Sequence, residues 1–271
     1  MNNVAIFPYN EFVLPVARHL STSKNFCLKE IITSKGSGVV GKDASFACNH
    51  PPIGIIVSDQ LDEISSEWDT LLVSVSIVEE MQLFEESLKL FERCLAGGKQ
   101  IIFADARNTH PPLFLKDLMS SYPGLTHFIS PVYNAHFNSL EYNIEYLVPS
   151  VPILLVGGLV KDSDSLEIVL SLQKQFKNSG YSVSCFANSD LGLFLRLHSL
   201  QHILEDKSKK ESEKIIAINQ LVRSVIRTER PDLLIIESPD AVLKYDDVTP
   251  NGFGILTHMV IQALEPSLFV C

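Results

Sequence analysis

The stretch from Val151 to Phe186 constrains the fold more than any other part of the chain. It begins with the apolar run PILLV and continues with Gly157 and Gly158, a pattern that predicts a buried parallel strand and a tight turn. Apolar residues then recur at three- and four-residue intervals, which predicts a helix with one buried face. The alternating segment YSVSCF predicts the next strand. This unit indicates a right-handed crossover, with the Gly157–Asp164 loop at the carboxyl edge of a sheet, where α/β proteins bind ligands.

The first half of the chain shows the same alternation of strands and helices. Apolar runs predict strands in the segments NVAIF, CLKEIIT, IGIIV, TLLVSVS and KQIIFA, and helical periodicity predicts helices at 11–20, 78–95 and 113–122. The sequence therefore predicts an α/β protein with two doubly wound, mainly parallel sheets of the Rossmann or flavodoxin type. Prolines and aromatic residues gather between Phe128 and Pro152, so we expect one domain at 1–148 and a second at 149–271.

Composition excludes several classes of protein. The chain has 271 residues, of which 46% are hydrophobic and 20% charged, so it can bury a full core without disulfides. The net charge of −10 disfavours binding to nucleic acid or to an anionic membrane, and no run of about 18 apolar residues predicts a membrane span. The five cysteines form no C-x-x-C pair, and the start lacks a secretory pattern. We therefore expect a cytoplasmic protein.

A glycine-rich segment, SKGSGVVGKDAS, is the most conspicuous motif of the first half. Gly36, Gly38 and Gly41 match G-x-G-x-x-G, and Lys42 extends the match to most of a P-loop, so the backbone here could cradle a phosphate. Asp43 stands where a P-loop has a Ser or Thr that meets Mg²⁺. The chain between Lys42 and the next strand is also too short for a crossover helix. The alternative is a loop whose glycines serve its conformation.

Polar residues follow two predicted strands. KQIIFA is followed by the polar residues Asp105, Arg107, Asn108 and His110. DLLIIE ends in Glu237, with Asp240 three residues further on. Acids at the carboxyl ends of parallel strands can orient water or Mg²⁺ in phosphoryl-transfer proteins. We therefore take Asp105, Glu237 and Asp240 as candidate catalytic residues and Arg107 as a candidate ligand-binding residue. The alternative after KQIIFA is a loop with an Asp/Arg pair and an exposed histidine. The alternative at Glu237 is a strand-edge carboxylate without a catalytic role.

Two histidines lie four residues apart in the segment LGLFLRLHSLQHILED. If this segment is one helix, His198 and His202 share a face and could chelate zinc. Ser199 replaces the glutamate of H-E-x-x-H, and no third ligand is evident from the sequence. A packed or solvated helix face is the alternative, and we predict no metal centre.

The second half resembles metabolic P-loop proteins of the dethiobiotin-synthetase kind. ILLVGG with the helix after it, together with PDLLIIE, is similar to the first strand, first helix and acid-ending strand of those proteins. The chain departs from them after Gly158, where Leu159-Val160-Lys161-Asp162-Ser163 replaces Gly-Lys-Ser/Thr. The resemblance implies the fold and places Gly157, Gly158 and Lys161 near a ligand, without implying ATP hydrolysis.

A second resemblance extends over nearly the whole chain. It is carried by the segments FPYNEFVLPVARHL, SKGSGVVGKDAS, EKIIAINQLV, PDLLIIESP and NGFGILTHMVIQAL. These resemble peptide maturation system proteins of clostridia, which are encoded beside radical-SAM enzymes and small cysteine-repeat precursor peptides. The resemblance implies a precursor peptide or its radical-SAM maturation enzyme as partner, and supplies no catalytic residues.

Two functional hypotheses follow. The first is an accessory protein that binds a ribosomally made precursor peptide or its modifying enzyme, without catalysis and without a cofactor. The second is an enzyme that binds a nucleotide with Mg²⁺ or another phosphorylated ligand, with Lys42 or Lys161 at the phosphate and Glu237 or Asp240 at the metal or water. A third possibility is a purely structural homodimer.

Overall fold

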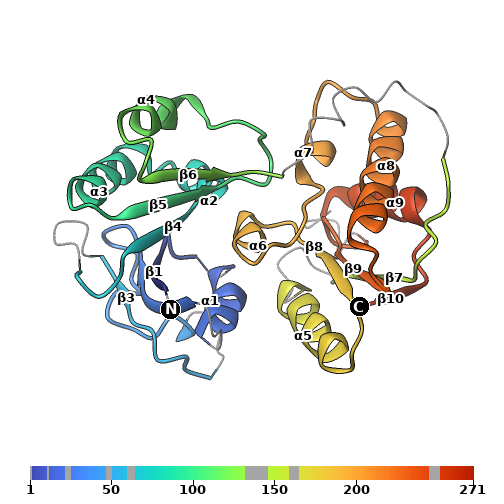
Figure 1. Ribbon diagram of the computed structural model, residues 1–271, viewed down its shortest axis with the longest axis horizontal. Coiled ribbons are helices and arrows are strands. Elements are labelled where there is room, and N and C mark those ends of the chain that lie inside the picture. Colours follow the sequence, from blue (N-terminus) through green and yellow to red (C-terminus); the bar gives the residue numbers. More distant parts are fainter. Residues whose placement is uncertain are drawn as a thin grey trace. The chain divides into compact units, whose positions relative to one another are not determined.

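The computed structural model describes residues 2–10, 12–21, 26–46, 51–59, 65–131, 146–158, 165–243 and 251–271. The chain divides into two compact units, Met1–Ser130 and Pro131–Cys271, each built on its own sheet (Figure 1). The sequence placed the boundary after residue 148, and the first strand of the second unit begins at Ile153. No helix among the described residues is long and apolar enough to cross a membrane.

The first unit contains a six-stranded sheet in the order β3-β2-β1-β4-β5-β6, in which every pairing between these strands is parallel. This order is that of a dinucleotide-binding Rossmann sheet. The strands and helices of this unit are β1 (Asn2–Phe7), α1 (Val13–Ser21), β2 (Phe26–Ile32), β3 (Val57–Ser58), β4 (Thr70–Ser74), α2 (Val75–Glu80), α3 (Phe84–Ala96), β5 (Gln100–Ala104), α4 (Leu113–Ser121) and β6 (Thr126–Ile129).

The second unit contains a four-stranded parallel sheet in the order β10-β7-β9-β8. Its elements are β7 (Ile153–Val156), α5 (Ser165–Asn178), β8 (Val183–Phe186), α6 (Asp190–Phe194), α7 (Gln201–Leu204), α8 (Glu211–Glu229), β9 (Leu233–Glu237), the 3₁₀ turn η3 (Asn251–Gly254), α9 (Ile255–Leu264) and β10 (Leu268–Val270). The prediction of an α/β protein with two mainly parallel sheets is confirmed.

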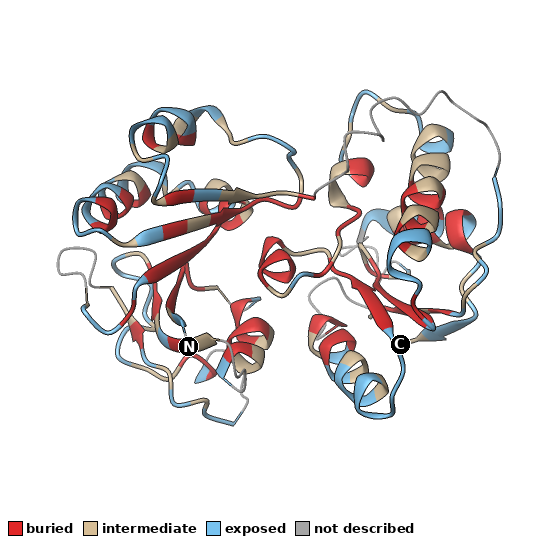
Figure 2. Cartoon of the chain, in the orientation of Figure 1, coloured by how far each residue is buried: buried red, intermediate tan, exposed pale blue. Residues whose placement is uncertain are grey.

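Helices cover both faces of each sheet, which explains why the strand sequences are apolar at almost every position. In β1 the adjacent residues Val4, Ala5, Ile6 and Phe7 are all fully buried (Figure 2). Ala5 and Phe7 pack in the core formed with α3 and α4, while α1 contacts the sheet at β2. In the second unit α8 and α9 contribute to the core over one face, and α5 contacts β8 and β9. Continuous burial of this kind is the mark of a parallel sheet.

The predicted helix 78–95 is two helices. The segment TLLVSVS leaves the sheet at Ser74, whose side chain caps α2, and α2 ends before Gln82, which has a positive φ of 53°. A new helix, α3, then begins at Phe84. Helical periodicity carries no information about this break, because the apolar spacing of α2 and α3 is nearly continuous.

Candidate functional site

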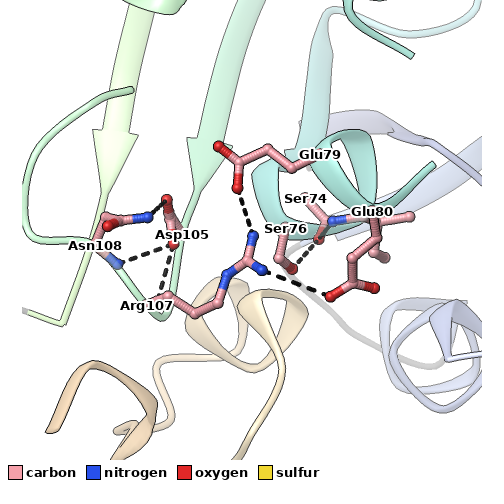
Figure 3. Close-up of polar contacts among 8 residues, drawn as sticks. Ser74, Ser76, Glu79, Glu80, Asp105, Arg107 and Asn108 are labelled. Atoms are coloured by element: carbon pink, nitrogen blue, oxygen red, sulfur yellow. Dashed lines mark hydrogen bonds and ion pairs between the residues drawn. The ribbon is translucent and has the colours of Figure 1, made fainter. Parts of the chain in front are cut away.

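Asp105 follows β5 at the carboxyl edge of the first sheet and is fully buried. Its Oδ1 accepts hydrogen bonds from the backbone N–H of Arg107 at 2.9 Å and of Asn108 at 3.0 Å, and its Oδ2 accepts one from Asn108 Nδ2 at 2.9 Å (Figure 3). A carboxylate that accepts from two successive backbone amides fixes the turn after the strand. The sequence placed Asp105, Arg107 and Asn108 together just after the strand, and Asn108 bonds Asp105 through both its backbone and its side chain.

Arg107 extends from this turn toward α2, where it meets two acids. Its Nη2 lies 2.8 Å from Glu79 Oε2 and its Nη1 lies 3.6 Å from Glu80 Oε1 (Figure 3). The Arg107 side chain is 19% exposed, so the pair with Glu79 is screened less than a surface ion pair. Glu79 and Glu80 carry two negative charges against the single positive charge of Arg107. An anionic ligand would therefore have to compete with these ion pairs for the guanidinium.

The glycine-rich segment is a turn-rich loop that makes an isolated antiparallel bridge, between Asp43 and Ile56. Gly41 N donates to Val57 O at 2.9 Å, Val57 N to Lys42 O at 2.9 Å and Ala44 N to Ile55 O at 2.8 Å. The segment thereby pairs with Val57 of β3 and with the residues just before it. The amides of Gly41 and Ala44 are used in this pairing, and no α-helix begins directly after Lys42 within residues 43–46. The geometry differs from a phosphate cradle, in which successive N–H groups point at the anion.

The carboxylate of Asp43 links this segment to residues 53 and 54 of the chain that pairs with it. Its Oδ1 accepts from Ser45 N, Ser45 Oγ and Ile53 N, and its Oδ2 accepts from Gly54 N at 2.7 Å. Burial opposes ionisation of Asp43, but these hydrogen bonds outweigh it and hold the pKa of the carboxyl below its ordinary value of 3.8. Gly36, Gly38 and Gly41 have positive φ angles of 83°, 74° and 76°. Glycine adopts such φ values without steric cost, so these residues are explained by the conformation of the loop. Lys42 Nζ lies over the Phe46 ring, 4.1 Å from its centroid.

In the second unit Glu237 ends β9 and is buried beside the start of α5. Ser165 Oγ donates to Glu237 Oε1 at 2.7 Å, and Asn188 N donates to Glu237 Oε2 at 2.8 Å. Asn188 Nδ2 donates in turn to the carbonyls of Glu237 and Ser238. Burial raises the pKa of Glu237, against the hydrogen bonds from Asn188 and Ser165. The sequence identified Glu237, but not Ser165 or Asn188, because their contacts depend on the neighbouring strand ends.

The residues around Glu237 form a close-packed edge. Gly157 follows β7, and a Cβ atom placed on it would lie 2.9 Å from Ser238 Cβ. Gly158 O accepts from Val242 N at 3.2 Å. Asp240 Oδ1 accepts from Ala241 N at 2.8 Å. Gly157, Gly158, Glu237 and Asp240 therefore belong to one edge of the second sheet, whereas Lys161 lies outside the described residues.

The histidine prediction was wrong in its structural premise, because His198 and His202 do not share a helix. α6 ends at Phe194, Arg196 has a positive φ of 60°, and His198 pairs with β8 through its backbone. His198 Nε2 lies 2.8 Å from Glu229 Oε1, and His202 lies in α7. Burial, and then Lys209, lowers the pKa of His202 to about 4. The described residues contain no group of three or more His, Cys, Asp or Glu side chains that could hold a metal.

Comparison with known proteins identifies the fold. No family model and no curated protein matches the sequence. A crystal structure of a DUF1611 family protein from Anabaena variabilis, at 2.30 Å resolution, matches with a TM-score of 0.60 and 14% sequence identity. The match covers 100% of this chain and 74% of that protein. At this level of identity the likeness shows a shared two-sheet α/β architecture.

Proposed function

We propose that this protein is an accessory binding protein of a peptide maturation system, which binds the precursor peptide or its radical-SAM maturation enzyme without catalysis of its own. The observation that supports this proposal is that two of the candidate catalytic acids accept hydrogen bonds from other residues of the chain. Asp105 accepts three hydrogen bonds within its own loop, and Glu237 accepts two from Ser165 and Asn188.

A catalytic carboxylate has to present an oxygen to the substrate, a water molecule or a metal ion. The hydrogen bonds of Asp105 join neighbouring positions of one turn, and those of Glu237 join the ends of neighbouring elements. Such contacts stabilise the loops at the carboxyl edges, and a rigid edge is suited to presenting a binding surface. The identity of the partner rests on the resemblance of the sequence segments to peptide maturation system proteins.

The test is direct binding of the full chain to each proposed partner. Surface plasmon resonance or calorimetry against the precursor peptide and against the radical-SAM enzyme should give a dissociation constant in the micromolar range or tighter for at least one of them. A peptide of the same composition in scrambled order is the control. The double variant Asp105→Asn and Glu237→Gln should bind equally well, provided that it melts within a few degrees of the native protein. Absence of micromolar binding to both partners would refute the proposal.

One observation favours the second candidate, an enzyme that binds a nucleotide or another phosphorylated ligand. Ser165 begins α5 and donates to Glu237 at the end of the adjacent strand β9, at 2.7 Å. In P-loop proteins a Ser or Thr at the start of the first helix and an acid at the end of a nearby strand together hold Mg²⁺. The hydroxyl and carboxylate oxygens present here are ligands of the type that Mg²⁺ takes.

Thermal unfolding with nucleotides, each with and without Mg²⁺, separates the two candidates. A ligand at about 100 times its dissociation constant stabilises the folded state by roughly 2.7 kcal/mol. Under the second candidate a nucleotide should raise the melting temperature, and Ser165→Ala should abolish the Mg²⁺-dependent part of the increase. A set of nucleotides that gives no increase excludes this candidate.

A further inference from the structure

The helices α3 and α4 begin side by side at the carboxyl edge of the first sheet. α3 ends just before the start of β5, and α4 ends just before the start of β6. Because these strands are parallel, both helices run from the carboxyl edge to the amino edge. Phe84 is the first residue of α3 and Phe114 is the second residue of α4. Their rings meet edge to face, with centroids 5.2 Å apart, so the first turns of the two helices are in contact.

Apolar side chains at these helix starts are exposed to solvent. Phe84 is 38% exposed, and the residues that flank the ring pair along the chain, Met81 and Leu113, are 39% and 80% exposed. Phe114 packs partly against the core. Single exposed apolar residues are common, whereas a group of them among polar residues marks an interaction site. Methionine and aromatic residues are also enriched at protein interfaces. We call these four residues the Phe84 surface.

The Phe84 surface lies in a part of the chain with a surplus of negative charge. Glu80 at the end of α2, and Glu85 and Glu86 in the first turn of α3, are exposed. Segments 79–89 and 105–117 together carry six acids and three bases, which gives a net charge of −3 with histidine neutral. The dipole of α3 favours acids in its first turn, but it does not explain Glu80, which ends another helix.

The charge selects the class of partner. A second copy of this chain, docked on the same surface by two-fold symmetry, would bring the glutamates of both copies together, and like charges across an interface oppose binding. An anionic membrane or a nucleic acid is repelled for the same reason. A segment that carries lysine or arginine beside apolar side chains instead gains both charge attraction and apolar burial.

We propose that the Phe84 surface docks a positively charged peptide segment that also carries apolar side chains. Phe84 and Leu113 contact the apolar side chains of the segment, and Glu80, Glu85 and Glu86 pair with its lysines and arginines. The docked segment belongs to the precursor peptide or to its maturation enzyme, and this assignment rests on the proposed function.

Synthetic peptides test the chemistry of the surface without the natural partner. The main probe is a short amphipathic helical peptide with leucine on one face and lysine on the other. Two comparison peptides replace every lysine by glutamate or every leucine by serine. In calorimetry on the full chain, the Leu/Lys peptide should bind about tenfold or more tightly than either comparison peptide. Its binding should weaken as NaCl is raised from about 50 to about 500 mM, because salt screens exposed charges.

A triple variant, Glu80→Gln with Glu85→Gln and Glu86→Gln, tests the location of the site. It should weaken binding of the Leu/Lys peptide by about tenfold or more, because it removes the opposite charges beside the apolar residues. The matched control removes three exposed acids elsewhere and changes the net charge of the chain equally. It consists of Glu67→Gln, Asp69→Asn and Glu211→Gln. The control should bind as tightly as the native protein.

Leu113→Ser tests the apolar part of the surface. Because Leu113 is 80% exposed, the melting temperature should stay that of the native protein. Binding of the Leu/Lys peptide should weaken about tenfold, as expected for an apolar anchor of an interface. Leu243→Ser is the control, because Leu243 is 61% exposed and lies in the second unit, and it should leave binding unchanged.

The natural partners separate this surface from the proposed function. If the precursor peptide or the enzyme binds the native chain and the triple variant equally, the proposed function stands and the surface is wrong. If neither natural partner binds, while the triple variant alone loses affinity for the Leu/Lys peptide, the surface stands and the proposed function falls. The proposal is overturned by absence of binding to the Leu/Lys peptide, by equal binding in the triple variant and its control, or by equally tight binding of the Leu/Glu peptide. A homodimer of the native chain that Leu113→Ser dissociates would assign the surface to a second copy and overturn it as well.

Discussion

Gly157 gives the sharpest test of how the second unit is packed. It follows β7 at the carboxyl edge, and a Cβ atom at this position would lie 2.9 Å from Ser238 Cβ and 3.1 Å from Phe269 Cζ. The φ of Gly157 lies outside the left-handed region, so alanine meets no backbone penalty there. Gly157→Ala therefore measures steric overlap alone.

The loss in free energy of unfolding depends on which neighbours of the added methyl group can move. Phe269 is 36% exposed, so its ring can turn away at low cost. Ser238 cannot, because its N donates to Val156 O at 2.7 Å and its Oγ lies 2.6 Å from Thr257 Oγ1. Overpacking in a core costs about 1–3 kcal/mol. With one fixed neighbour and one that can turn away, we expect a loss of about 2 kcal/mol, or roughly a thirtyfold change in the folding equilibrium constant.

Urea unfolding followed by circular dichroism measures this free energy. Gly124→Ala is the matched control, because a Cβ there meets nothing within 4 Å and its φ is also outside the left-handed region. The control reports the effect of alanine on the unfolded chain, which is about 0.4–1 kcal/mol and stabilising. Adding Ser238→Gly to Gly157→Ala removes the main overlap and should recover part of the loss as a coupling energy. A difference between Gly157→Ala and Gly124→Ala of less than about 0.5 kcal/mol would refute the packing argument.

Three further predictions concern titratable and reactive groups. Burial raises the pKa of Glu237 above 4.5, so its contribution to stability is complete below about pH 4.5 and is lost as pH rises through the folded-state pKa. In urea unfolding between pH 4 and 8, native protein should lose stability relative to Glu237→Gln, and a constant difference would contradict this. Asp43→Ala removes the acceptor of four hydrogen bonds and should cost about 1–3 kcal/mol, with faster hydrogen exchange at residues 53 and 54; unchanged exchange would show that the loop holds without it. Burial raises the pKa of two thiols to about 12, so iodoacetamide should label exposed Cys271 in the native protein and, only after unfolding, Cys94 and Cys185. Mass spectrometry that finds either buried thiol labelled under native conditions would contradict this.

The glycine-rich segment shows how a motif can match a phosphate-binding pattern while its backbone amides bond within the chain. Gly36, Gly38, Gly41 and Lys42 satisfy a phosphate-binding pattern, yet the amides of Gly41 and Ala44 donate to the approach to β3. The sequence also contained evidence against a phosphate-binding loop. Asp43 stands where a P-loop has Ser or Thr, and the chain between Lys42 and the next strand is too short for a helix. The antiparallel pairing itself depends on where β3 runs, and neighbouring residues do not encode that position.

The sequence located the candidate acids that end a strand, and it did not reveal the residues that contact them from other elements. Asp105 and Glu237 each end a run of apolar residues, so their place at a strand end is readable from the sequence. Ser165 and Asn188 contact Glu237 from other elements, and a pattern of apolar residues says nothing about such pairings. The prediction that His198 and His202 share one helix was wrong for a related reason. The apolar spacing is compatible with one helix, whereas the positive φ at Arg196 breaks it.

The sequence by itself determined the class of fold, because continuous apolar runs alternating with amphipathic segments can be buried only as parallel strands covered by helices on both faces. It also determined the edge at which acids would lie, since a polar residue after a buried strand has to leave the core. Tertiary structure alone decided the strand order, and with it the switch point between β1 and β4. It also enclosed Glu237 with Ser165 and Asn188. These contacts join residues as far as 72 positions apart in the chain, from Ser165 to Glu237, and only the packed sheet sets their proximity.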